Sequence, residues 1–173
     1  KQTSISNKNY YLINNESEIE KWLKEAEENG EIAIDTETTS LNPHLADLVG
    51  ISLSTKIGSA CYIPIGHKKG QCLNQEKVLK KLKPILEDES IKKIGQNIKF
   101  DFIVLKHRGV KMNSMEDTML MSYVLDAGKN RHNMDTLSEI HLNHKTIAFK
   151  DIVGSGKKEI NFSDVEINKA LQY

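Results

Sequence analysis

Apolar residues recur at helical intervals near the start of the chain. Ile19, Trp22, Leu23 and Ala26 fall on one face of a helix, and such periodicity predicts an amphipathic helix. The stretch from Ser17 to Glu20 has the spacing of a capping box, and Asn29-Gly30 ends the run. The pattern therefore predicts a helix over residues 17–29.

Short apolar runs with turn signals between them come next. They cover residues 31–35, 48–53 and 60–63, and Asn42-Pro43 and Lys56-Ile57-Gly58 separate them. Consecutive strands joined by short turns are typical of an antiparallel meander. We therefore expect three neighbouring strands in one sheet.

Helices dominate the pattern of the remaining chain. Helical runs are predicted at residues 78–86, 97–108, 117–125, 134–142 and 163–173, with one short strand at 93–95. Asn97 is expected to cap the second of these helices, and a second capping box at 163–166 to open the last. Asp117 and Asp135 precede apolar runs and are expected to act as caps. Alternating strands and helices predict an α/β fold with a mixed sheet flanked by helices.

Composition places the chain among single-domain globular proteins, because its 173 residues are 38% hydrophobic and 28% charged. Lysine plus arginine equals aspartate plus glutamate at 24 each, so no global field attracts or repels nucleic acid. No run approaches the roughly 18 apolar residues that span a bilayer, and the first residues lack a signal-peptide pattern. With only two cysteines, we expect a cytoplasmic protein without a membrane partner. Residues 1–9 are polar, lack periodicity and are interpreted as a linker remnant.

Two carboxylates stand at the end of the apolar run 32–34. Asp35 and Glu37 lie two positions apart, and the period of a strand turns both to one side. Like charges close together near the core repel each other unless cations neutralise them. An all-oxygen site of this kind suits Mg²⁺ or Mn²⁺, and pairs of such ions cleave phosphodiesters. The pair therefore predicts metal-dependent hydrolysis of nucleic acid.

A second acidic segment follows the strand at 93–95. Asp101 falls within the first turn of the predicted helix after Gly95-Gln96-Asn97. An aspartate at this place usually complements the helix dipole. Its occurrence downstream of Asp35 and Glu37 favours a shared site.

These segments together resemble the 3′–5′ proofreading exonuclease domain of bacterial DNA polymerase I, in the superfamily named for its Asp-Glu-Asp-Asp set. The resemblance covers nearly the whole chain. It implies a ribonuclease-H-like fold, and we assign the exonuclease domain to residues 10–173. The segments that carry the likeness are residues 35–38, 48–52, 62–64, 83–88, 96–101, 117–120 and 131–137.

The resemblance implies a catalytic role for four residues. Asp35 would bridge two Mg²⁺ or Mn²⁺ ions, Glu37 would ligate one of them and contact the attacking water, and Asp101 would support the second. Tyr173 stands where the family's third motif begins, with a hydroxyl that orients the water. The family's fourth carboxylate would follow four residues later, so the domain is expected to be truncated here and weakened or inactive.

The resemblance also implies contacts with the substrate. Leu41 and Phe149 would pack against the terminal bases, while Thr36 and Asn97 would lie near the terminal sugar or phosphate. Leu41 could equally be a core residue and Phe149 a loop anchor. Stacking on aromatic side chains ignores base sequence, and a mismatched end costs less to unpair.

The leading hypothesis is a monomeric domain that releases nucleoside monophosphates from a single-stranded or frayed 3′ end of DNA, with a polymerase domain downstream in the same chain. Two alternatives remain. The first is an inactive exonuclease-like scaffold of a polymerase, which the three retained acids disfavour. The second is a 3′–5′ ribonuclease of the same superfamily.

Overall fold

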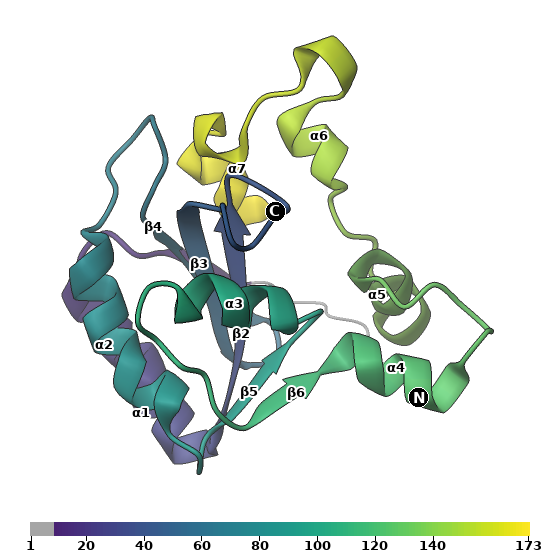
Figure 1. The fold of residues 1–173 in the computed structure, drawn as a ribbon, viewed down its shortest axis with the longest axis horizontal. Coiled ribbons are helices and arrows are strands. Elements are labelled where there is room, and N and C mark those ends of the chain that lie inside the picture. The colour runs from purple at the N-terminus through teal and green to yellow at the C-terminus, as the bar shows by residue number, and fades with distance from the viewer. Residues whose placement is uncertain (1–8) are drawn as a thin grey trace.

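A mixed sheet forms the centre of the protein (Figure 1). The computed structural model describes residues 9–173. The strand order is β1-β4-β3-β2-β5-β6, with β2–β3 and β3–β4 antiparallel and the other pairs parallel. The predicted meander is therefore confirmed. The strands are β1 (Asn9–Leu12), β2 (Glu31–Thr38), β3 (Leu48–Lys56), β4 (Ser59–Pro64), β5 (Lys92–Gly95) and β6 (Met115–Asp117).

The two edge strands were not predicted. β1 and β6 contain four and three residues, too few to show a clear alternation of apolar and polar positions. Each is a strand because a neighbour offers hydrogen bonds, β4 to β1 and β5 to β6. Of the predicted linker, residues 1–8 lie outside the described residues, and Asn9 already belongs to β1.

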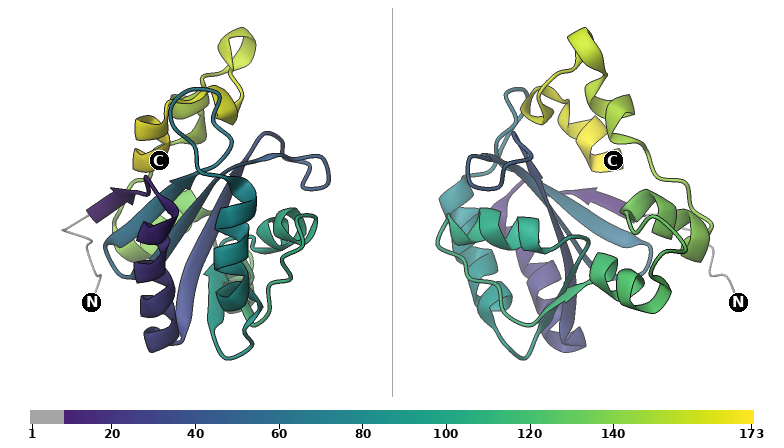
Figure 2. Two further views of the ribbon diagram at one scale, coloured as in Figure 1. Left: turned by 90° about the vertical axis from the view of Figure 1, so that its left-hand side faces the viewer. Right: turned by 45° about the vertical axis from the view of Figure 1, so that its right-hand side comes forward.

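Helices α1, α2 and α3 cover one face of the sheet, and Figure 2 shows α1 and α2 side by side on it. Their apolar side chains pack on Ile32 and Ile34 of β2 and on Ile51 and Leu53 of β3 in the main core. A smaller cluster involving α6 and α7 lies on the opposite face, against Val49 and Tyr62. The helices are α1 (Ile19–Asn29), α2 (Gln75–Glu87), α3 (Lys99–Lys106), α4 (Thr118–Asp126), α5 (Met134–Leu142), α6 (Phe149–Val153) and α7 (Ile167–Gln172).

Both predicted capping boxes are wrong, for the same reason. The Oδ1 atom of Asn15 accepts hydrogen bonds from the backbone N–H and the hydroxyl of Ser17, and Asn161 does the same for Ser163. Each serine is thus a donor inside a short 3-10 turn instead of the acceptor that starts an α-helix. The α-helices α1 and α7 begin later, at Ile19 and Ile167.

The start of α3 also differs from the prediction. Asn97 has a φ of 56°, in the left-handed region, and makes no side-chain cap; the helix begins at Lys99 and ends at Lys106. The backbone N–H of Asn97 instead donates to Asp117, 2.9 Å away. Asp117 also caps α4 through the N–H of Met119, as predicted.

Helix α5 has the predicted bounds, but Asp135 lies inside it and does not cap it. Its carboxylate accepts a hydrogen bond from the Thr146 hydroxyl at 2.5 Å.

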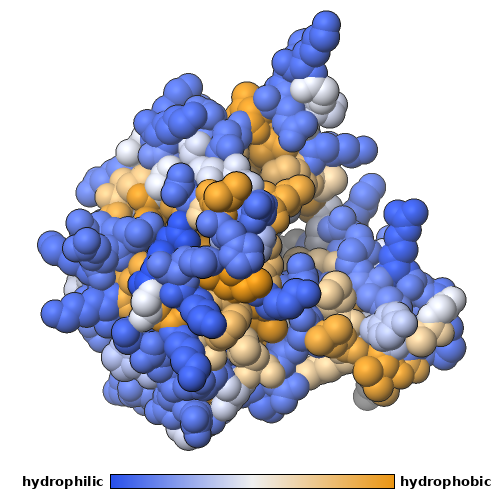
Figure 3. Space-filling view, viewed as in Figure 1, coloured by the Kyte–Doolittle hydropathy of each residue, from blue (hydrophilic) through white to orange (hydrophobic). Residues whose placement is uncertain are grey.

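Helix α4 has no buried residue. Figure 3 shows apolar side chains on the surface over α4, where Leu120, Val124 and Leu125 are exposed. Within residues 9–173, no helix has both the length and the apolar content that crossing a membrane requires.

Candidate functional site

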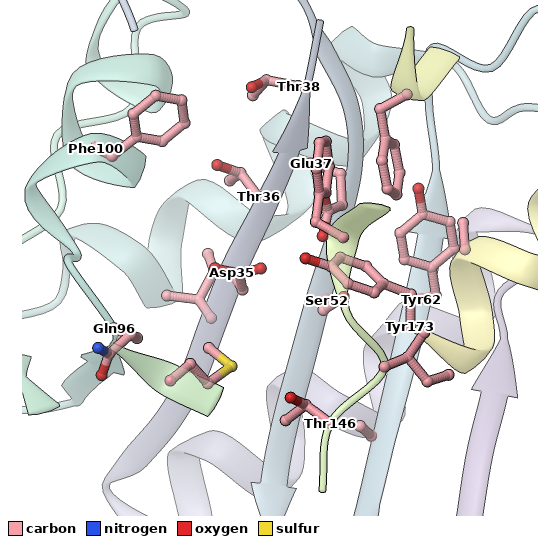
Figure 4. Close-up of a pocket in the computed structure, with 18 of the residues that line it drawn as sticks. Asp35, Thr36, Glu37, Thr38, Ser52, Tyr62, Gln96, Phe100, Thr146 and Tyr173 are labelled. Carbon is pink, nitrogen blue, oxygen red and sulfur yellow. The ribbon is translucent and has the colours of Figure 1, made fainter. Parts of the chain in front are cut away.

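One large cavity of about 920 Å³ lies on the sheet face opposite α1 and α2, bordered by parts of β2, α6 and α7 (Figure 4). It brings together residues far apart in the sequence, because one face of β2 lies across it from the C-terminal helices. Two of the eight predicted site residues, Asp101 and Asn97, are not among its lining residues. The predicted residues that line it are Asp35, Thr36, Glu37, Leu41, Phe149 and Tyr173.

Asp35 and Glu37 share the cavity face of β2. Ile34 and Thr36 between and beside them are buried on the other side, as the period of a strand requires. Burial raises the pKa of Asp35 to about 7, and the charge of Asp101 adds to the effect. Burial raises the pKa of Glu37 to about 8, with further contributions from Asp35 and Asp101. Metal-free, the pair therefore holds protons near neutral pH.

Asp101 reaches the site from behind β2. It is 2% exposed, and its Oδ1 accepts hydrogen bonds from the backbone N–H of Thr36 at 2.8 Å and from the Thr36 hydroxyl at 2.6 Å. β5 pairs with β2 only as far as Ala33, so the Thr36 N–H has no strand partner on that side. Burial raises the pKa of Asp101 to about 6 despite the opposing effect of these bonds.

Within residues 9–173, no basic side chain neutralises this acidic set. Among the described residues, no ion pair involves Asp35, Glu37 or Asp101, and neither Asp35 nor Glu37 accepts a side-chain hydrogen bond from the protein. The described part of the chain likewise contains no closed cluster of three or more His, Cys, Asp or Glu around a single metal position. The arrangement is an open row of carboxylates beside a cavity.

An aromatic cluster stands opposite the carboxylates. The ring of Phe162 is buried, lies parallel to that of Phe149 at 6.2 Å and is 5.9 Å from that of Tyr173. Burial raises the pKa of the Tyr173 phenol, and Glu37 and Asp35 add to the effect. The Tyr173 hydroxyl therefore stays protonated and can donate a hydrogen bond into the cavity. Phe149 is 46% exposed, so one side of its ring is available for stacking.

The remaining predicted contacts occupy different positions. Leu41 is 93% exposed in the loop between β2 and β3, and so it is not a core residue. Thr36 is 7% exposed and gives its hydroxyl to Asp101, which orients that carboxylate. Asn97 is exposed and lies outside the cavity lining.

Sequence reasoning missed the contribution of Tyr62 on β4 to the cavity. Tyr62 lines the cavity, and Figure 4 shows it together with Tyr173 across from Glu37. Its phenol lies over Gly50, where an added Cβ would come within 2.0 Å of the hydroxyl. The hydroxyl is hydrogen-bonded to His67 at 2.6 Å. No local pattern signals this role, because a buried tyrosine in a strand reads as an ordinary core residue.

Comparison with known proteins identifies the family of the chain. A family model described as a 3′–5′ exonuclease matches residues 10–173. DNA polymerase I of Rhizobium leguminosarum is 41% identical over 95% of this chain, and that of Pseudomonas aeruginosa is also 41% identical over 95%. The chain spans 18% and 19% of the length of these two relatives.

Two solved structures illustrate the likeness in fold. NrnC of Brucella melitensis with bound Mg²⁺ has a TM-score of 0.65 and 25% identity, covering 96% of this chain and 71% of that protein. RNase D of Escherichia coli has a TM-score of 0.63 and 20% identity, covering 83% of this chain and 36% of that protein, and shows the fold alone. The predicted ribonuclease-H-like fold is thereby confirmed.

Proposed function

The chain belongs to the family of 3′–5′ exonuclease domains found in DNA polymerase I, and on this premise we propose that it hydrolyses the 3′-terminal phosphodiester of DNA and releases nucleoside monophosphates. The observation that carries the proposal is the row of Asp35, Glu37 and Asp101 beside a cavity, with no basic side chain in the described residues to neutralise it. Bound divalent cations would supply the missing positive charge.

The donor set fits divalent magnesium or manganese. It consists of hard carboxylate oxygens. Burial, together with the charges of neighbouring carboxylates, raises the pKa values of Asp35 and Glu37, and a bound cation would favour their charged forms. Mg²⁺ is commonly held by one or two carboxylates together with substrate phosphates, so a closed protein cage is not needed. Asp35 and Glu37 would hold one ion, and Asp101 would support a second through Oδ2, because both Thr36 bonds fall on Oδ1.

The chemistry of the bound ions would be to lower the pKa of a water molecule and to stabilise charge on the leaving oxygen. The protein's own groups would position the reactants. Glu37 would accept a hydrogen bond from the attacking water, and the Tyr173 hydroxyl, held protonated by burial and by nearby carboxylates, would donate one. Thr36 would keep Asp101 in place through two hydrogen bonds.

The terminal nucleotide would lie between Phe149 and Leu41, which are far apart in the sequence and border the same cavity. The exposed ring of Phe149 would stack on a base, and the exposed Leu41 would cover it from the loop after β2. Such contacts tolerate any base. The preference for a mismatched end would arise from its lower cost of unpairing.

A ribonuclease activity is the second candidate, because NrnC and RNase D share the fold. The sequence relatives favour DNA, since both 41% identical proteins are DNA polymerases. We also propose, from those relatives, that a polymerase domain is the natural neighbour of this domain.

The test measures release of mononucleotides from a 3′-mismatched DNA duplex with Mg²⁺, with Mn²⁺ and with a chelator. It uses residues 1–173 and a longer chain that includes the position four residues after Tyr173, where the family's fourth carboxylate is expected. Asp35→Asn and Asp101→Asn should reduce the rate by at least a hundredfold, since each removes a charged ligand. Glu27→Gln, on the exposed side of α1, is the matched control.

Metal-dependent release that the control retains and both site variants lose would support the proposal. Release from both chains that survives Asp35→Asn would contradict the assigned site. No release from either chain with either metal would favour the inactive scaffold. A matched RNA oligomer cleaved faster than the DNA would favour the ribonuclease.

A further inference from the structure

The segment after β4 is joined by hydrogen bonds and an ion pair to the segment that leads into α7. The backbone N–H of Lys68 donates to the carbonyl of Ser163 at 2.8 Å, and the Lys68 ammonium pairs with Asp164 at 2.8 Å. His67, 8% exposed, bonds the carbonyl of Val165 through Nδ1 at 2.9 Å. Residues about a hundred positions apart in sequence are therefore joined immediately before the helix that carries Tyr173.

The bonds of His67 determine its tautomer. A carbonyl can only accept, so Nδ1 must carry the proton that it donates to Val165. Nε2 is then an acceptor, and the Tyr62 hydroxyl donates to it at 2.6 Å. Burial lowers the pKa of His67, which agrees with a neutral ring. Each polar atom of the imidazole is thus used, one toward β4 and one toward α7.

Two routes connect His67 with Tyr173. The first is the carbonyl of Val165, two residues before α7, whose six residues end beside Tyr173. The second is the buried ring of Phe162, which lies 6.1 Å from the imidazole and 5.9 Å from the ring of Tyr173. Neither His67 nor Phe162 carries a charged group into the cavity.

From this geometry we propose that His67 is a positioning residue for the exonuclease reaction: by donating to the Val165 carbonyl while accepting from Tyr62, it fixes α7 and so holds the Tyr173 hydroxyl across the cavity from Glu37. The inference rests on the proposed function, in which that hydroxyl orients the attacking water. It assigns to His67 no contact with substrate or metal. Its Nδ1 bond to the Val165 carbonyl, just before α7, is the essential one.

Two conservative variants separate the bonds of His67. An asparagine places an amide N–H near the position of Nδ1, so His67→Asn keeps a donor for Val165 and loses the acceptor for Tyr62. A glutamine reaches the position of Nε2, so His67→Gln keeps the partner of Tyr62 and loses the donor to Val165. The same change at exposed His141, His141→Gln, is the matched control.

We expect His67→Gln to lower kcat about 10- to 100-fold with a smaller change in KM, as expected for a displaced reacting group. His67→Asn and the control should stay within about threefold of the wild type. In a Tyr173→Phe background, His67→Gln should cause little further loss, because the hydroxyl that it positions is already absent. Equal losses in the Asn and Gln variants, or an undiminished loss in that background, would overturn the proposal.

Hydrogen exchange measures the effect of His67 on the stability of α7 independently of nuclease activity. The α7 amides of Lys169 and Ala170 donate to the carbonyl of Glu166 at 2.9 and 3.0 Å. They should exchange faster in His67→Gln than in His67→Asn, while α1 amides remain unchanged. Equal protection of α7 in both variants would overturn the inference. If the wild type lacks nuclease activity but the two variants differ in α7 exchange as expected, only the proposed function is refuted.

Discussion

Replacing Asp35 by asparagine should stabilise the metal-free protein at pH 8 and have almost no effect near pH 4. The native pKa values of Asp35 and Glu37 are about 7 and about 8, whereas those of the unfolded chain lie near 4. Between these limits the native state binds more protons than the unfolded state, so the free energy of unfolding falls as the pH rises through this window. Above the native pKa the penalty is complete.

The magnitude follows from the size of the shift. One pKa unit corresponds to about 1.4 kcal/mol, so the shift of Asp35 sets an upper limit of about 4 kcal/mol. Asparagine removes this penalty and also removes the Asp35 charge that raises the pKa of Glu37. Allowing for relaxation around the charge, we expect Asp35→Asn to stabilise the protein by about 2–4 kcal/mol at pH 8, or about 5–15 °C in Tm.

The assay is urea and thermal unfolding with a chelator at pH 4.5, 6 and 8, with Glu27→Gln as control. Adding Mg²⁺ or Mn²⁺ at pH 8 should raise the Tm of the wild type, because the ions bind the carboxylates of the native state. The Tm of Asp35→Asn should rise much less, because this variant lacks one of those carboxylates. A stability difference that is the same at all three pH values would refute the reasoning. So would a wild type that becomes more stable than Asp35→Asn as the pH rises.

Three further substitutions test side-chain contacts seen in the structure. Gly50→Ala should destabilise the protein by about 1–3 kcal/mol in urea unfolding, since the new Cβ would strike the Tyr62 ring; an unchanged midpoint would show that Tyr62 moves freely. Phe149→Ala should weaken substrate binding by about 1–3 kcal/mol in a KM measurement, with little change in Tm because the ring is half exposed; an unchanged KM would remove it from the binding surface. Lys93→Met should cost about 1–3 kcal/mol in thermal unfolding, because the buried ammonium donates to the carbonyls of Asp88 and Ile91, between α2 and β5; a gain in stability would show that these carbonyls need no donor.

Most secondary-structure elements could be predicted from local patterns in the sequence. The apolar periods of α1, α2 and α5 and of the meander identified those elements, since each pattern repeats within a short stretch. The caps at Asn15 and Asn161 were missed because an asparagine can turn a following serine into a donor. The strands β1 and β6 were missed because they exist through their neighbours alone.

The sequence by itself determined that Asp35 and Glu37 face one side, because the period of a strand is a property of the backbone. Only the tertiary structure decided what meets them. Asp101 and Thr36, which are hydrogen-bonded, lie 65 positions apart in the sequence. His67 and Val165, which are also hydrogen-bonded, lie 98 positions apart. Contacts of this range depend on how the elements pack, and so the partners of the acidic pair, the aromatic cluster and the cavity exist only in the folded protein.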